Sequence, residues 1–185
     1  MTTKTLNISE EQLVDYSKAH NEPSWMTELR QKALKLTETL EMPKPDKTKL
    51  RKWDFDTFKQ HHTTGDSYHQ LTDLPKSVKE IIDVENSENL IIQHNNDLAY
   101  TQVSDQAKND GVIIEGLSEA LVNHSDLVQK YFMTKAVNVD EHRLTALHTA
   151  LVNGGIFVYV PKNTVVEHPI QYVVLHDDEQ ASFYN

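Results

Sequence analysis

The amino-acid sequence changes from helical periodicity in its first part to short β-branched and aromatic runs in its last part. Ser9 followed by Gln12 has the spacing of a capping box, which predicts a short helix through about His20. Pro23 is a favourable first helical residue and predicts a second helix that ends near Leu40. Helical and strand-like runs are both present, and the predicted fold class is α+β.

The middle of the chain alternates short helices and strands. Pro75 predicts a helix over KSVKEIIDV, and NLIIQHNNDLAYTQVS predicts a β-hairpin that turns at Asn95 and Asn96, because asparagine tolerates positive φ. GVIIEGL predicts a further strand. Ser118 and Ser125 are expected to be the N-caps of two more short helices.

The last part of the chain carries an amphipathic helix followed by strands. The helix is expected to start at Asp140 and end at Gly154, and its apolar face holds Leu144, Leu147 and Leu151. IFVYVP, TVV and QYVVLH then predict short strands, and the similar settings of Phe157 and Tyr172 suggest one coil of a repeating β structure. The sequence stops at SFYN within an apparent further strand. We therefore expect the part from about residue 155 onward to be the least stable, with faster hydrogen exchange than the hairpin at 90–103.

Composition excludes several classes of site. The chain has no cysteine, which excludes disulfides, thiolate metal sites and a thiol nucleophile. No apolar run approaches the roughly 20 residues that span a bilayer, and MTTKTLNISEEQ lacks the apolar core of a secretory signal. A cytoplasmic location is therefore expected.

The charge is unevenly distributed. Residues 1–60 hold 11 Lys and Arg against 10 Asp and Glu, whereas residues 61–185 hold 7 against 18. An acidic body repels nucleic acid and anionic lipid, so a basic partner fits it better, and neither nucleic acid nor membrane is expected to bind. A basic cluster beside Trp53, Phe55 and Phe58 departs from this pattern: Lys44, Lys47, Lys49, Arg51 and Lys52. It is interpreted as a solvated linker, with single-stranded nucleic-acid binding as the alternative.

The histidines do not form a ligand pattern. His61, His62 and His69 fall in a polar stretch, residues 60–74, which is expected to be an exposed loop without a third ligand at metal spacing. His142 and His148 would point to different faces of one helix, and His148 is expected to be a packed core residue. Phosphate-loop, dinucleotide, zinc-protease and nucleophile-elbow motifs are absent, and no acidic pair stands out as sheltered in an apolar setting. The sequence predicts no catalytic, cofactor-binding or metal-ligating residue and no enzyme activity.

Several stretches together resemble the SufB/SufD family of iron–sulfur cluster assembly scaffolds. One is Glu22-Pro23-Ser24-Trp25-Met26 with Arg30 and Ala33, followed by Trp53 and by Gly111-Val112-Ile113-Ile114 leading to Leu117 and Ala120. Another runs from Leu144 through ALHTALVNGGIFVYVPKNTVVEHPIQ to Gln171. The resemblance is to the D-type subunit, because cysteine is absent and the N-terminal region is short. Asn163 replaces the usual glycine after Val-Pro-Lys and is expected to keep a left-handed turn.

The resemblance implies a division into N-terminal helices at 1–45, an α/β region with the hairpin and short helices at 46–153, and the truncated start of a right-handed parallel β-helix core at 154–185. It also implies a scaffold that acts by protein contact with a SufB-like paralogue and a SufC-like ATPase, the latter docking to a C-terminal region outside this chain. The cluster would be handled by the whole complex, with its ligands beyond Asn185 and none in this segment. The alternative function is a β-helix enzyme acting on carbohydrate, since fold does not decide function.

Overall fold

A computed structural model describes residues 6–55 and 57–185. Residues 1–5 of the expected helical segment 1–45 lie outside the described residues, and so does the side chain of Arg51 from the basic cluster. The α-helices are α1 (Glu10–Ala19), α2 (Ser24–Thr39), α3 (Lys76–Lys79), α4 (Asp105–Asn109), α5 (Leu117–Asn123), α6 (Ser125–Tyr131) and α7 (Arg143–Leu151). Short 3-10 turns are η1 (Leu50–Lys52), η2 (Leu71–Asp73) and η3 (Val84–Asn86).

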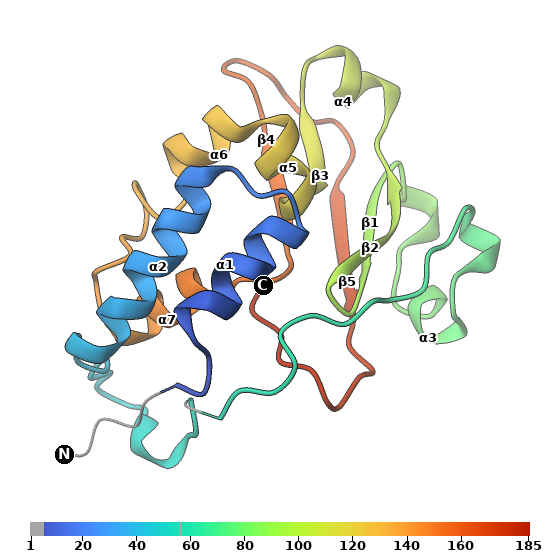
Figure 1. Ribbon diagram of the computed structural model, residues 1–185. Coiled ribbons are helices and arrows are strands. Elements are labelled where there is room, and N and C mark those ends of the chain that lie inside the picture. The colour runs from blue at the N-terminus through green and yellow to red at the C-terminus, as the bar shows by residue number, and fades with distance from the viewer. Residues whose placement is uncertain (1–5, 56) are drawn as a thin grey trace. The chain divides into compact units, whose positions relative to one another are not determined.

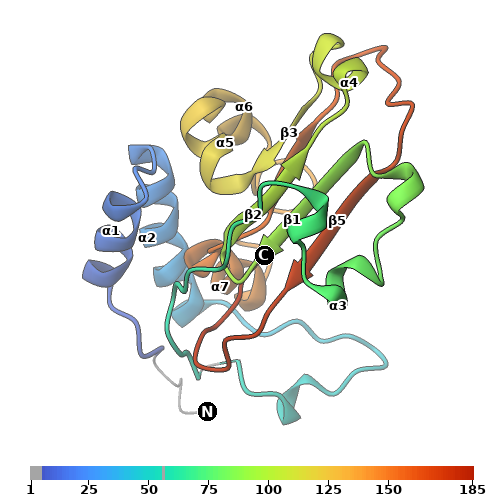
Figure 2. The same cartoon turned by 90° about the vertical axis from the view of Figure 1, so that its right-hand side faces the viewer.

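The strands form two small sheets, as Figures 1 and 2 show. They are β1 (Asn89–His94), β2 (Asp97–Gln102), β3 (Ile113–Gly116), β4 (Ile156–Tyr159) and β5 (Ile170–Leu175). One sheet has the order β2-β1-β5, and the other pairs β3 with β4. The mixture of separate helices and small sheets confirms the predicted α+β class.

The chain divides into two compact units. A helical unit comprises residues 1–61, 120–152 and 184, and a sheet unit comprises residues 62–119, 153–183 and 185. Both units combine residues that are far apart in the sequence. The predicted division into the domains 1–45, 46–153 and 154–185 therefore remains a prediction. None of the described helices has the length and apolar character needed to cross a membrane.

The helical unit is built on α2, which packs against α7 and α1 (Figure 1). The predicted capping box is confirmed: the Ser9 hydroxyl accepts from the Gln12 amide N–H at 3.2 Å, and the Gln12 side chain accepts from the Ser9 N–H at 2.8 Å. These bonds satisfy amide groups that the start of a helix otherwise leaves unpaired. The apolar faces of the helices meet in one core, whose buried members include Leu13, Ala33, Leu147, Ala150 and Leu151.

The sheet unit is organised around β1, which lies between β2 and β5 (Figure 2). All six residues of β1 are buried. The predicted hairpin is confirmed: β1 pairs antiparallel with β2, and Asn95 in the turn has a φ of 56°. Alternate β1 side chains enter two different cores because successive strand residues point to opposite faces. Leu90 and Ile92 pack in a cluster that includes Val78, whereas Ile91 packs in a cluster that includes Ile114.

The expected β-helix coil at 154–185 is not what these strands form. β4 pairs antiparallel with β3, and β5 pairs parallel with β1 along its whole length, from Asn89 opposite Ile170 to His94 opposite Leu175. The two strands therefore complete sheets that begin upstream instead of stacking on each other. The sequence pattern identified them as strands, but a two-residue period does not specify the partner of a strand.

Several predicted helix boundaries are also corrected. Ser118 lies inside α5, and Ser125 is the first residue of α6, whose N-cap is His124. The last helix begins at Arg143 rather than Asp140, because the side chain of His142 accepts from the Thr145 N–H. The segment KSVKEIIDV is an α-helix only over α3, and TVV does not form a strand.

Candidate functional site

A buried ion pair between Glu22 and Arg30 lies at the centre of the helical unit. Glu22 precedes the Pro23 that opens α2, and Arg30 lies on the buried face of that helix. The guanidinium binds the carboxylate through two contacts, Nη2 to Oε1 at 2.6 Å and Nε to Oε2 at 2.8 Å. The two side chains are only 2% and 5% exposed. Because buried charges are tolerated only when they are fully paired, this geometry fixes the start of α2.

The other donors of Arg30 reach the end of α7. Nη1 donates to the Ala150 carbonyl at 3.0 Å, and Nη2 donates to the Val152 carbonyl at 2.7 Å. The last carbonyls of a helix have no partner within the helix, so the guanidinium supplies one. The same group lies 5.0 Å from the ring centroid of Tyr16 on α1. One side chain thus connects α1, α2 and α7.

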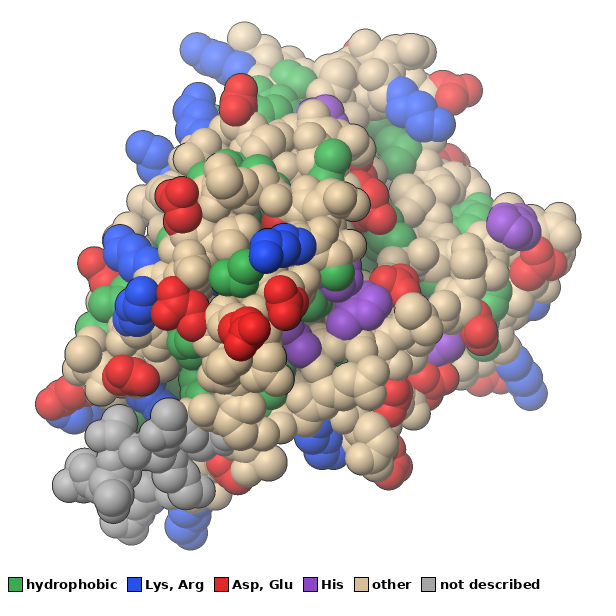
Figure 3. All heavy atoms as spheres, in the orientation of Figure 1, with side chains coloured by type: hydrophobic (Ala, Val, Ile, Leu, Met, Phe, Trp, Pro, Cys, Tyr) green, Lys and Arg blue, Asp and Glu red, His purple; other side chains and the backbone are tan. Residues whose placement is uncertain are grey.

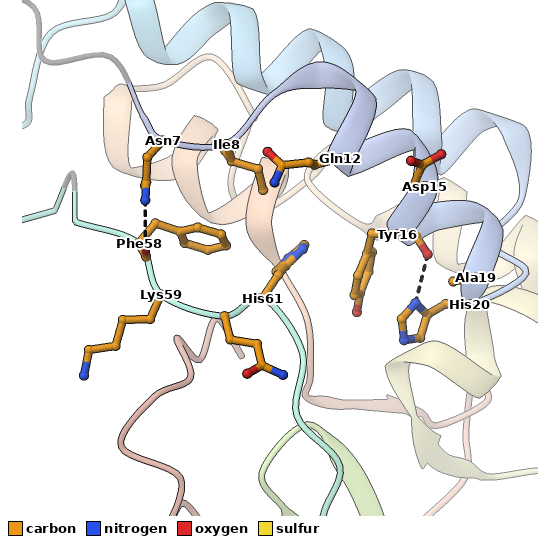
Figure 4. A pocket seen from close by; sticks show the side chains of 11 residues that line it. Asn7, Ile8, Gln12, Asp15, Tyr16, Ala19, His20, Phe58, Lys59 and His61 are labelled. Carbon is orange, nitrogen blue, oxygen red and sulfur yellow. Dashed lines mark hydrogen bonds between the residues drawn. The ribbon is translucent and has the colours of Figure 1, made fainter.

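A pocket of about 490 Å³ lies between α1 and residues 58–61. Figure 4 shows the side chains that line it, which come from α1, from the residues next to its two ends and from the segment 58–61. The Asn7 side-chain amide donates to the Phe58 carbonyl at 2.9 Å and joins the two walls. The lining residues are Asn7, Ile8, Gln12, Asp15, Tyr16, Ala19, His20, Phe58, Lys59, Gln60 and His61.

Four rings of this pocket form a contiguous row. His20 stacks on Tyr16 with ring centroids 4.0 Å apart, Tyr16 is 4.2 Å from His61, and His61 meets Phe58 edge-on at 5.4 Å. His20 also donates through Nδ1 to the Tyr16 carbonyl at 2.8 Å, which fixes its ring (Figure 4). The pocket therefore presents ring faces and side-chain amides, groups that bind by shape and hydrogen bonding.

His61 is held in its neutral form. Burial lowers its pKa to about 4; the charge of Arg30 also lowers the pKa, and a hydrogen bond from Nε2 to the Leu151 carbonyl at 3.0 Å partly offsets these effects. The imidazole is consequently uncharged at neutral pH. The prediction of an exposed loop at 60–74 is wrong for this residue, because the ring packs against Tyr16 and Phe58.

A second polar cluster ties together the hairpin of the sheet unit. The buried Gln93 side chain accepts from the Gly155 N–H at 3.0 Å and from the Tyr172 hydroxyl. His94 donates to Asp177 at 2.9 Å, and Asn95 donates to the same carboxylate at 3.1 Å. These two hydrogen bonds lower the pKa of Asp177. The polar side chains next to the turn thus find hydrogen-bond partners, which buried polar groups need in order to offset the loss of water.

The histidines singled out in the sequence do not come together as ligands. His62 contacts Asp97 at 3.1 Å, His69 is exposed, His142 is a helix cap, and His148 is half-buried on α7. Across residues 6–55 and 57–185, no group of three or more His, Asp or Glu side chains is placed to hold a metal ion.

Sequence reasoning missed the site at Glu22 and Arg30. Both residues belong to the family resemblance, Glu22 in the Glu-Pro-Ser-Trp-Met stretch and Arg30 after it, but the sequence pattern predicts no contact between them. The available signal was an arginine on the apolar face of an amphipathic helix. Such a residue is rarely buried without a partner.

Comparison with protein families places residues 9–172 in the family described as the SufBD protein N-terminal region. The chain belongs to this family. It is 45% identical over 181 residues to the iron–sulfur cluster assembly protein SufD of Bacillus subtilis (strain 168), an alignment that covers 97% of this chain and 41% of that protein. This confirms the resemblance to SufD that was inferred from the sequence.

More distant members of the SufBD family align over a similar extent. An iron–sulfur cluster assembly SufBD family protein of Pyrococcus horikoshii is 30% identical over 179 residues, covering 91% of this chain and 40% of that protein. A SufBD family protein of Staphylococcus epidermidis is 26% identical over 186 residues, covering 95% of this chain and 40% of that protein. The chain thus spans about two fifths of the length of these three relatives. The matched region 9–172 includes Glu22, Arg30 and the lining of the pocket except Asn7 and Ile8.

Proposed function

We propose that this chain acts in iron–sulfur cluster assembly as the N-terminal region of a SufD-like scaffold, through protein–protein contacts rather than catalysis. The observation that carries the proposal is the match of residues 9–172 to the SufBD N-terminal family, together with 45% identity to a protein named for this process. The cytoplasmic location expected from the sequence is part of the proposal.

The site geometry is consistent with a scaffold role. Arg30 donates hydrogen bonds to Glu22 and to carbonyls at the end of α7, so its guanidinium connects α2 with α7. His61 is neutral and donates to a carbonyl of the same helix end. These groups give the helical unit a rigid arrangement, and rigid elements are what a docking surface needs.

The cluster is the cargo of the proposed assembly, and we propose that this chain supplies no ligand to it. The chain has no cysteine, and the described side chains include no group of three potential metal ligands. Anaerobic reconstitution of the purified chain with iron and sulfide should give less than one cluster per chain. A stoichiometric charge-transfer band without any added partner would contradict this part of the proposal.

The proposed partners are a SufB-like paralogue and a SufC-like ATPase. The names of the relatives support a Suf-system role in general, and these two partners follow from the family resemblance. The alternative of a β-helix enzyme acting on carbohydrate has no support in the strand pairing of the described residues, because β4 and β5 complete upstream sheets.

Gene disruption in the source organism tests the function. We expect loss of this gene to lower the activity of iron–sulfur enzymes while a cluster-free enzyme keeps its activity. Re-expression of the wild-type gene should restore the activity of the iron–sulfur enzymes. Unchanged iron–sulfur enzyme activity, in cells shown to lack any second SufD-like gene, would contradict the proposal.

A further inference from the structure

The segment that follows α2 presents an exposed tryptophan beside a row of lysines. Trp53 is 63% exposed, which is unusual for so large an aromatic side chain. Its ring stacks near Phe55, with centroids 6.0 Å apart and ring planes at 16°. Phe55 in turn packs against the core of the helical unit. The indole therefore lies near Phe55 on one side, while most of its surface is exposed to solvent.

Most charged residues of the segment that carries this indole are basic. Lys47, Lys49 and Lys52 are exposed, and Lys44 is 81% exposed although it pairs with Glu41 at 2.6 Å. The nearby Asp54 carboxylate accepts hydrogen bonds from the Thr57 N–H and hydroxyl, so it is engaged locally. Residues 44–55 hold five Lys and Arg against the two carboxylates Asp46 and Asp54, so the segment is positive on a chain with a net charge of −10.

Side chains of opposite charge lie on different elements of the helical unit. Acidic side chains gather over α1 on the face shown in Figure 3, where the helix carries the exposed residues Glu10, Glu11 and Asp15. The lysines of 44–52 lie in the loop and 3-10 turn that follow α2 (Figure 2). A basic segment attracts a negatively charged partner, whereas the acidic side chains of α1 repel one.

We propose that residues 44–55 form a docking surface for an acidic protein partner, with Trp53 as the anchor and Lys47, Lys49 and Lys52 as the charge contacts. Tryptophan is among the residues that most often dominate binding energy, and surrounding lysines raise the rate of encounter with a negative surface. This inference concerns a surface distant in sequence from the strands of the sheet unit and does not depend on the assembly function.

A protein fits this surface better than a nucleic acid. Single-strand binding needs a basic groove that tracks the backbone and several aromatic platforms for successive bases. Here Trp53 is open, but Phe55 is half-buried beneath it. Within residues 44–55 the chain therefore offers one exposed aromatic ring rather than a series of platforms.

The test uses the two indole N–H signals of the chain in a proton–nitrogen correlation spectrum. Trp25 is the other tryptophan, and its Nε1 donates to the Ser125 hydroxyl at 2.9 Å, so it serves as an internal reference. The probe is a glutamate-rich peptide that contains leucines, titrated at low and at physiological ionic strength. A peptide with glutamine in place of glutamate and an oligothymidine strand are the comparison ligands.

We expect the acidic peptide to shift the Trp53 signal and leave the Trp25 signal in place, with weaker binding at higher salt. Reversing the patch by Lys47→Glu, Lys49→Glu and Lys52→Glu should weaken binding by on the order of tenfold or more. The matched control also reverses three exposed lysines of the helical unit outside the patch, and it should bind like wild type; it carries Lys18→Glu, Lys32→Glu and Lys135→Glu.

Three results would overturn the inference. The first is an unchanged Trp53 signal with the acidic peptide, or equal shifts with the glutamine peptide. The second is tighter binding of oligothymidine than of the acidic peptide, which would make the surface a nucleic-acid site. The third is self-association in light scattering that the patch reversal abolishes and the control does not, which would make a second copy the occupant.

Discussion

Replacement of Arg30 by methionine should be among the most destabilising single changes in the helical unit. Methionine keeps much of the apolar stem but removes the two hydrogen bonds to Glu22 and those to the carbonyls of Ala150 and Val152. The remaining carboxylate, 5% exposed, would keep only the hydroxyl of Ser17 at 2.8 Å. Removing one partner of a buried ion pair costs roughly 3–5 kcal/mol. That is a large part of the ~5–15 kcal/mol that stabilises a typical domain.

Urea unfolding followed by far-ultraviolet circular dichroism measures this loss. Two variants separate charge from packing. Glu22→Gln combined with Arg30→Met leaves no buried charge, so it should cost less than Arg30→Met alone, about 1–3 kcal/mol for the unpaired carbonyls. Arg30→Lys keeps the charge but cannot bind two carboxylate oxygens and two carbonyls at once, so it should lie between wild type and Arg30→Met.

Lys35→Met is the matched control on the same helix. Lys35 pairs with Glu10 at 3.3 Å, but the side chains are 67% and 45% exposed. Exposed pairs contribute about 0–1 kcal/mol, so this variant should unfold close to wild type. If Arg30→Met lost no more stability than Lys35→Met, the central role given to the buried pair would be wrong.

Three further predictions concern His61, Asn163 and Gly65. Burial lowers the pKa of His61 from the 6.5 of a free imidazole to about 4, so between these pH values the unfolded chain binds a proton that the folded chain does not. The free energy of unfolding should therefore be highest above about pH 6.5 and should fall by about 3 kcal/mol as the pH drops to 4. His61→Gln should flatten this slope in denaturant titrations, whereas His69→Gln at an exposed position should not. Asn163 has a φ of 65°, so Asn163→Gly should leave thermal stability nearly unchanged and Asn163→Val should cost about 1–2 kcal/mol. A Cβ at Gly65 would lie 2.1 Å from the His94 carbonyl oxygen, so Gly65→Ala should lower the unfolding midpoint by the equivalent of about 1–3 kcal/mol, and an unchanged midpoint would contradict the close approach.

Local signals in the sequence predicted local structure well. The capping box at Ser9 and the hairpin turn at Asn95 are confirmed, because each depends on groups that are close in sequence. Asn163 adopts the left-handed conformation that was expected of it. In each case the physical requirement, a paired amide or a positive φ, involves only a few neighbouring residues.

Long-range pairing was not available from the same signals. β5 joins β1 across some eighty positions of sequence, and Arg30 binds carbonyls 120 and 122 positions away. A strand pattern gives the alternation of faces but not the partner, and a lone arginine gives no indication of which carbonyl it will meet. The neutral state of His61 depends on the same kind of contact, since both burial and the bond to Leu151 come from tertiary packing.

The most direct test of the assembly role is a chimera of B. subtilis SufD in which its region aligned to this chain, 45% identical over 181 residues, is replaced by the chain itself. In cells that depend on the chimera, we expect iron–sulfur enzyme activity near that given by wild-type SufD, and we expect it to be lost when the chimera carries Arg30→Met. A chimera that is made in normal amounts and remains folded, yet leaves iron–sulfur enzymes inactive, would contradict the proposal that this chain performs the work of a SufD N-terminal region.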